Sequence, residues 1–170
     1  MKKAASPHTY MRAVLQRVRS AAVHGALALT VNGEQVSSIG PGILALIGVC
    51  TEDTSEHADW VISKMTSLKL WPEGASVTVR PDEARPWRTN VRELGGEILC
   101  VSQFTLYAKT AKGSKPDFHR AMGGAGAEPF YREFLDKLRA AHDAEKVKDG
   151  KFGAMMDVSL VNDGPVTIRE

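Results

Sequence analysis

The apolar positions along the chain predict a sheet with a covered centre. From Arg12 to Val23 apolar and polar residues alternate, which is typical of a strand with one buried face. This alternation turns Arg17 toward the interior, where charged side chains are rare. The nearly continuous apolar run Ile43–Val49 predicts a central strand that is covered on both faces.

Turn signals divide the remaining strand-like segments. Asn32-Gly33 favours a two-residue hairpin between expected strands at 26–31 and 34–39. Gly40-Pro41-Gly42 predicts another reversal before the central strand. Near the end of the chain, Asp149-Gly150 predicts a hairpin turn, and a further alternating strand is expected at 154–161.

Two helices are predicted by apolar residues at helical spacing. The first begins at Asp53 or Thr54, with Glu56 three residues after Asp53 as in a capping box. The second begins near Glu128-Pro129, because proline suits the first turn of a helix. The apolar stripes are Ala58, Val61, Ile62, Met65 and Leu68 in the first helix and Phe130, Tyr131, Phe134, Leu135, Leu138 and Ala141 in the second. Residues 73–96 are expected to have the least regular structure.

The stretch Ile98–Tyr107 carries the first candidate chemistry. Its apolar start predicts a strand buried on both faces, and Ser102, Gln103 and Thr105 follow with no glycine or proline to indicate a loop. Burying such groups unpaired costs about 1–3 kcal/mol each. They therefore favour a polar pocket inside the protein, and the alternative is a strand end whose hydroxyl groups bond to nearby backbone.

Length and composition indicate one globular domain. The 170 residues are 43% hydrophobic and 25% charged, which suits a single packed core. We expect residues 11–170 to form this domain and residues 1–10 to be a mobile extension or a cloning remnant. No apolar run approaches the roughly 18 residues of a membrane span, so we expect no membrane insertion. Cys50 and Cys100 lack disulfide-framework or redox-motif spacing, which favours a reducing, cytoplasmic setting.

Positive charge is local rather than general. The formal net charge is only +2, so contact with nucleic acid requires a basic patch. One candidate patch lies in the irregular segment and consists of Arg80, Arg85, Arg88 and Arg92, for which a solvated loop is the simpler interpretation. A second patch, which could contact RNA phosphates, consists of Lys109, Lys112, Lys115, His119 and Arg120.

Familiar catalytic motifs are missing. The chain has no HExxH sequence, no zinc-ligand spacing and no glycine-rich dinucleotide motif, so we expect no metal and no nucleotide cofactor. If Ser102 or Thr105 is a nucleophile, the sequence does not identify its base, and a Ser-His-Asp triad stays open because its members need only meet in space. The alternative is a site whose backbone N–H groups stabilise an oxyanion, each contributing about 2.7–4 kcal/mol. Gly164-Pro165 is either an ordinary turn or a cis peptide.

Two separated motifs resemble those of a known family. Ser102-Gln103-Phe104-Thr105-Leu106 and Asn162-Asp163-Gly164-Pro165-Val166-Thr167 are similar to the signature motifs of the D-aminoacyl-tRNA deacylases, also called D-tyrosyl-tRNA deacylases. Met11–Val18 resembles the family's amino terminus. Lys115–His119 and Lys148–Ala154 resemble its eukaryotic branch. The resemblance implies an α/β fold of layered, antiparallel-rich sheets with two main helices, and a homodimer.

The resemblance also implies an activity and roles for individual residues. The activity is hydrolysis of the ester between a D-amino acid and the terminal adenosine of tRNA, whose own 2′-hydroxyl would help activate water. The pocket would be lined by Ser102, Gln103, Phe104 and Thr105, with backbone near Phe104 and Thr105 facing the ester carbonyl. A cis Gly164-Pro165 would enter the pocket of the partner subunit and hold the substrate's amino group. Supporting residues would be Arg17, Asn162 and Thr167, and tRNA contacts would be Lys112, Lys115, His119 and Arg120.

The chain departs from the family pattern in its enlarged segments 24–29 and 77–90 and at Ala108, where many relatives have glycine. Two competing hypotheses follow. One is a nucleic-acid-binding module of the same fold, in which the basic patches matter and Thr105 does not. The other is a deacylase of relaxed chirality that acts on mischarged glycyl- or L-alanyl-tRNA, against which Phe104 and the intact second motif argue.

Overall fold

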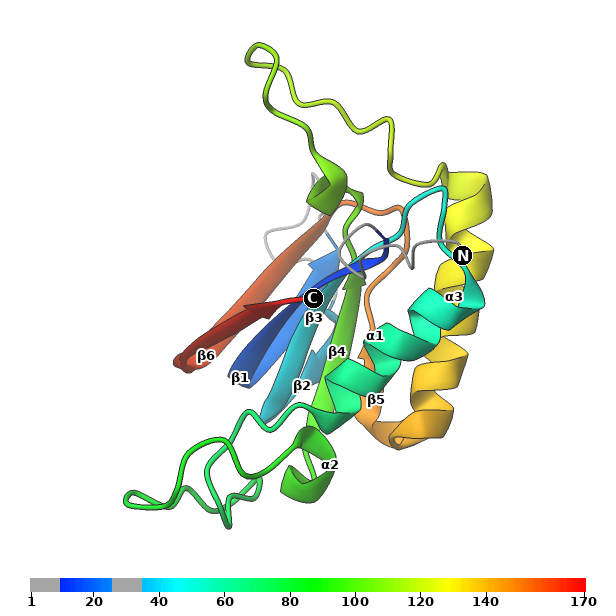
Figure 1. Ribbon diagram of the computed structural model, residues 1–170. Coiled ribbons are helices and arrows are strands. Elements are labelled where there is room, and N and C mark those ends of the chain that lie inside the picture. Colours follow the sequence, from blue (N-terminus) through cyan, green and yellow to red (C-terminus); the bar gives the residue numbers. More distant parts are fainter. Residues whose placement is uncertain (1–9, 26–34) are drawn as a thin grey trace, which may run out of the picture.

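The computed structural model describes residues 10–25 and 35–170 (Figure 1). The elements in chain order are β1 (Arg12–Gly25), β2 (Gln35–Ile39), β3 (Gly42–Gly48), α1 (Ser55–Ser67), α2 (Val91–Leu94), β4 (Glu97–Ser102), the 3₁₀ turn η2 (Phe104–Tyr107), α3 (Gly124–Ala141), the 3₁₀ turn η3 (Ala144–Lys146), β5 (Val147–Asp149) and β6 (Met156–Arg169). One sheet has the order β2-β1-β3-β4-β5, and β6 pairs with β1. The pairs β3–β4 and β4–β5 are parallel and the others antiparallel. The expected antiparallel-rich α/β fold with two main helices, α1 and α3, is confirmed.

The strand β1 is paired along both of its edges. β6 follows one edge over most of its length, so β2 and β3 share the other edge. Ile39 of β2 faces Ala21, and Gly42 of β3 faces Val18, so the chain keeps its direction across Gly40-Pro41. The reversal predicted there is therefore wrong. Glycine at position 42 allows a close approach instead, since a Cβ would lie 1.9 Å from a carbonyl oxygen of β4.

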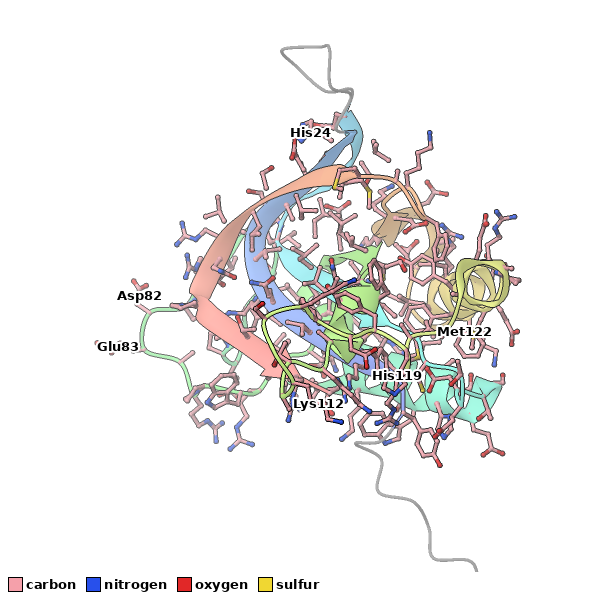
Figure 2. The ribbon with its side chains drawn as sticks, turned by 90° about the horizontal axis from the view of Figure 1, so that it is seen from above. His24, Asp82, Glu83, Lys112, His119 and Met122 are labelled. Carbon is pink, nitrogen blue, oxygen red and sulfur yellow. The ribbon has the colours of Figure 1, made fainter. Side chains whose placement is uncertain are left out.

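Two hydrophobic clusters cover the two faces of the sheet. The helices α1 and α3 lie side by side over one face (Figure 1), where Met65, Phe134 and Leu138 are fully buried. Each such side chain contributes about 1.5–3 kcal/mol by leaving water. The second cluster lies on the other face, where Val158 and Leu160 of β6 pack against residues of β1, β2, β3 and β4. The sheet is strongly curved, as the view from above shows (Figure 2).

The helices differ from the sequence predictions in three details, although α1 begins where it was predicted. The helix α1 is capped by Thr54, and its capping box uses His57 rather than Glu56. The helix α3 begins at Gly124 rather than near Glu128-Pro129, because amides after the glycine-rich stretch already bond to the Gly123 carbonyl. The short helix α2 was not predicted. It forms because the Asn90 side chain accepts hydrogen bonds from the amides at its start.

The end of the chain also differs from its prediction. Asp149-Gly150 does not form a hairpin, because β5 pairs in parallel with β4 whereas β6 crosses to β1. β6 begins at Met156, inside the strand predicted at 154–161, and continues through the second motif. The Asn32-Gly33 turn, most of segment 24–29 and residues 1–9 of the expected extension lie outside the described residues. In the described part of the chain, no helix is long and apolar enough to cross a membrane.

Candidate active site

The first motif lies at the end of β4, where the strand gives way to a tight turn. The Gln103 amide donates to the Ile47 carbonyl oxygen of β3 at 2.7 Å, and η2 begins at the next residue. The prediction of a strand that turns polar inside the protein is wrong. Phe104 and Thr105 are exposed, because η2 carries the chain away from the sheet.

The exposed side of η2 offers both backbone and side-chain groups. The amides of Phe104 and Thr105 begin the turn, where amides lack an internal acceptor, and no acceptor for them is found among the described residues. The Gln103 Nε2 donates to Thr105 Oγ1 at 2.5 Å. The Phe104 ring, 56% exposed, lies edge to face with Phe118 at a centroid distance of 5.1 Å. The motif therefore presents amide donors beside an aromatic surface.

Tyr107 anchors this turn to the start of β1. Its ring is buried, its hydroxyl donates to the Tyr10 carbonyl oxygen at 2.6 Å, and burial raises the pKa of this hydroxyl. The Arg12 guanidinium lies 4.5 Å from the Tyr107 ring centroid and donates to the Leu106 carbonyl oxygen at 2.5 Å. The backbone of the turn is thus fixed from within.

The second motif forms a bulge in β6. Asn162 faces Val18 and Thr167 faces Gln16, so the four residues Asp163, Gly164, Pro165 and Val166 face only Arg17 of β1. The Gly164–Pro165 peptide is cis, and both residues are exposed. Gly164 has φ +127°, and a Cβ there would lie 3.2 Å from Nη2 of Arg17.

A cluster of charges lies behind this bulge. Arg17, whose side chain is 14% exposed as its inward position predicts, donates from Nε to the Asp163 carbonyl oxygen at 2.9 Å and from Nη1 to the Leu70 carbonyl oxygen. Its Nε also lies 3.3 Å from Oδ2 of Asp163. Arg80 donates from Nη2 to Oδ1 of Asp163 at 2.6 Å. Sequence reasoning missed this contact of Arg80, because residues 83 positions apart give no pairing signal beyond opposite charge.

The two motifs lie apart within one chain. Ser102 of β4 faces Ile47 of β3, which faces Ala13 near the start of β1. The bulge lies in β6, on the other side of β1, beside Arg17. Four residues along β1 and three strand spacings put the motifs roughly 20 Å apart along the sheet. A cavity of about 700 Å³ beside Asp163 includes no residue of the Ser102–Thr105 motif. One chain therefore keeps the two motifs apart.

The predicted tRNA-contacting residues lie on an arm, residues 108–122, that projects beyond the sheet (Figures 1 and 2). Lys109 and Asp117 pair across the arm. His119 Nδ1 lies 2.6 Å from Oδ2 of Asp117. The hydrogen bond from the His119 backbone amide, and to a smaller extent the one from its side chain, lower the pKa of the Asp117 carboxyl. Lys112 and Lys115 are exposed, whereas Arg120 lies at the base of the arm, where its carbonyl accepts from the Thr51 amide.

The loop arginines are divided by their contacts. Arg80 bonds to Asp163, and Arg85 forms an ion pair with Glu73 at 2.9 Å, so their charges are partly neutralised within the chain. Arg88 is exposed.

Across residues 10–25 and 35–170, no group of three His, Cys, Asp or Glu side chains is placed to hold a metal ion.

Comparison with known proteins defines the class to which this fold and its two motifs belong. A family model described as D-Tyr-tRNA(Tyr) deacylase matches residues 14–169. The D-aminoacyl-tRNA deacylase of Yarrowia lipolytica is 50% identical over 160 residues, which cover 94% of this chain and 96% of that protein. The D-aminoacyl-tRNA deacylase of Drosophila melanogaster is 47% identical over 94% of this chain and 90% of that protein.

A solved structure named c-Myc DNA Unwinding Element Binding Protein superimposes with a TM-score of 0.81 at 43% identity, and the match covers 94% of this chain and 97% of that chain. The chain belongs to the D-Tyr-tRNA(Tyr) deacylase family. The resemblance stated from the two motifs is thereby confirmed.

Proposed function

We propose that this protein hydrolyses the ester bond of D-aminoacyl-tRNA and releases the free D-amino acid and tRNA. The observation that carries this proposal is the family match over residues 14–169 together with both motifs intact. The ester of an aminoacyl-tRNA is already activated, so stabilising the oxyanion and placing a water molecule lower most of the barrier. Backbone amides of Phe104 and Thr105 supply the oxyanion donors, and the exposed Phe104 ring offers a face for the terminal base.

The active form is a homodimer in which each pocket takes one half-site from each chain. The roughly 20 Å between the motifs and the exposure of Pro165 support this arrangement. Backbone carbonyls near Gly164 hold the substrate's amino group, and inversion of the α-carbon drives a substituent into rigid backbone. A ten-thousand-fold preference for the D-enantiomer requires only about 5.5 kcal/mol. The 2′-hydroxyl of the terminal adenosine supplies the missing proton-transfer group.

The direct test measures deacylation of D-tyrosyl-tRNA and L-tyrosyl-tRNA by the purified protein. We expect release of D-tyrosine to exceed that of L-tyrosine by orders of magnitude, and a terminal 2′-deoxyadenosine to slow it. Equal rates on both enantiomers favour the relaxed-chirality enzyme, and glycyl- and L-alanyl-tRNA then become the substrates to measure. Absence of turnover refutes the proposal.

Shared pockets are tested by subunit complementation. Thr105→Arg blocks one half-site and Pro165→Arg blocks the other. A heterodimer purified through two different tags then contains one intact pocket of two, and its activity should be about half that of the wild type. Activity no higher than that of either parent variant shows that each pocket is built within a single chain.

A second candidate function is nucleic-acid binding without catalysis. Two observations favour it: the similar solved structure is named as a DNA-binding protein, and the lysines of the arm are exposed. Its test is binding of bare RNA or DNA by the wild type at physiological salt, with Thr105→Arg as the matched variant. Tight binding in both proteins with no ester turnover in either supports the binding module.

The tRNA substrate and the two buried free thiols, Cys50 and Cys100, also support a cytoplasmic location. The single family match over residues 14–169 supports one domain over residues 11–170. Fractionation of cells that express the full chain tests the location.

A further inference from the structure

The bulged segment of β6 lacks the support that strands normally receive. Between Asn162 and Thr167, four residues have no Cα partner in β1. Gly164 and Pro165 are exposed, and the cavity of about 700 Å³ lies beside Asp163. Neither ladder hydrogen bonds nor packing therefore fixes this segment on the cavity side. Its geometry depends on side chains that reach it from elsewhere in the chain.

Asp163 is the one residue of the bulge that is buried, with 9% of its side chain exposed. Arg17 holds its backbone carbonyl and one carboxylate oxygen, while Arg80 holds the other oxygen at 2.6 Å. Arg19 Nε lies 3.9 Å from that same oxygen, at the limit of an ion pair. The side chains of Arg19 and Arg80 are similarly exposed, at 59% and 57%, so the distance distinguishes them. Charge-assisted hydrogen bonds are stronger and more directional than such distant pairs. Arg80 is thus the second close support of Asp163.

The loop that carries Arg80 is itself attached to the core. The Val77 amide donates to the Leu94 carbonyl oxygen at 3.1 Å, and Ser76 and Val79 exchange backbone hydrogen bonds at 3.1 and 3.2 Å. Arg80 therefore extends from a turn with a defined position, and it crosses to β6 at the edge of the cavity. A contact that begins on a fixed turn can transmit position rather than only charge.

We propose that Arg80 is a positioning residue that holds the bulged segment Asp163–Val166 through the Asp163 carboxylate and so sets how strongly the site discriminates D from L substrates. This inference rests on the proposed deacylase function, because the backbone next to Asp163 is what reads the substrate's amino group. It assigns a role in the reaction to the enlarged 77–90 segment, which the sequence suggested was a solvated loop.

The test compares the wild type with Arg80→Ala in two assays. In kinetics with D- and L-tyrosyl-tRNA, kcat/KM for the D substrate should fall about three- to tenfold, mainly through a higher KM. The D/L ratio, that is the ratio of kcat/KM for the two enantiomers, should fall by at least about threefold. Hydrogen exchange of the Asn162 and Thr167 amides, at the last residues that pair with β1 on either side of the bulge, should become roughly several-fold faster because the support of the bulge is lost. Arg80→Lys should restore part of the ratio, since lysine keeps the charge but not the fork geometry.

The matched control is Arg85→Ala, which removes another loop arginine; its partner, Glu73, is exposed, and neither residue lines the cavity beside Asp163. It should leave both the D/L ratio and the exchange rates unchanged. Unchanged exchange in Arg80→Ala overturns the positioning role. Faster exchange with an unchanged D/L ratio overturns its link to selectivity. If the wild type hydrolyses no D-aminoacyl-tRNA, the proposed function fails, and the exchange assay still decides the positioning role.

Discussion

Replacing Gly164 by alanine perturbs the second motif at a single carbon atom. Gly164 has φ +127°, where L-residues are strained, and the added Cβ would lie 3.0 Å from the Val166 amide nitrogen and 3.2 Å from Nη2 of Arg17. Holding such a backbone conformation costs about 1–3 kcal/mol. Because the bulge is exposed and has no ladder partner, it can relieve this strain by moving, which displaces the carbonyls that we propose hold the substrate's amino group.

The same free energy predicts the kinetic effect. If native geometry must be restored for each turnover, kcat/KM for D-tyrosyl-tRNA falls roughly 5- to 150-fold. The free energy of unfolding should change by less than about 1 kcal/mol, because an exposed segment that moves leaves the core intact. Steady-state deacylation and urea denaturation measure these two quantities.

The control is Gly95→Ala, at a left-handed helix cap with φ +72°, where an added Cβ would lie 3.9 Å from Nζ of Lys146 and would contact neither motif. It should lose about 1–2 kcal/mol of stability and no activity. Full D-specific activity in Gly164→Ala would refute the argument that backbone near Gly164 reads the substrate.

Two further predictions concern pH and salt. Burial raises the pKa of the Asp149 carboxyl above its ordinary value of 3.8, so the folded state binds this proton more tightly than the unfolded state. The contribution of Asp149 to stability therefore falls as the pH rises from 3.8 through the folded pKa. Asp149→Asn, which keeps an oxygen for the Tyr131 hydroxyl, should flatten the decline in urea-denaturation free energy over that window, and an unaltered slope would contradict the assignment. Replacing Lys112 and Lys115 together by alanine should raise KM for D-tyrosyl-tRNA and leave kcat unchanged. The slope of log KM against log salt concentration should fall by about two, one for each lost phosphate contact. A KM that keeps its full salt dependence would show that the arm does not contact phosphates.

Elements with a strong local pattern could be predicted from the sequence. The alternation in β1 and the apolar stripes of α1 and α3 arise from burial on one face, which the order of residues records directly. Glycines were harder to interpret. The turn predicted at Gly40–Gly42 fails because Gly42 is needed for the approach of β4, a requirement that depends on a distant strand.

The candidate site shows the same limit. Its two motifs were visible as sequence, and so was an inward Arg17, but η2 placed Phe104 and Thr105 outside the core instead of within it. No local pattern shows that a strand will end in a 3₁₀ turn when its residues have strand propensity. The Arg80–Asp163 contact could not be predicted either, because it depends on how a loop folds back over 83 residues.

The strand β1 limits where this chain can be lengthened. Arg12 at its start contacts the η2 turn, and Arg17 further along contacts the bulge in β6, so the supports of both motifs depend on one register. A single inserted residue between them would turn the following side chains to the opposite face and disconnect one motif from its support. The enlarged segments 24–29 and 77–90 begin outside this interval. Growth of the chain in evolution can thus alter what approaches the active site while the spacing of its two supports is kept.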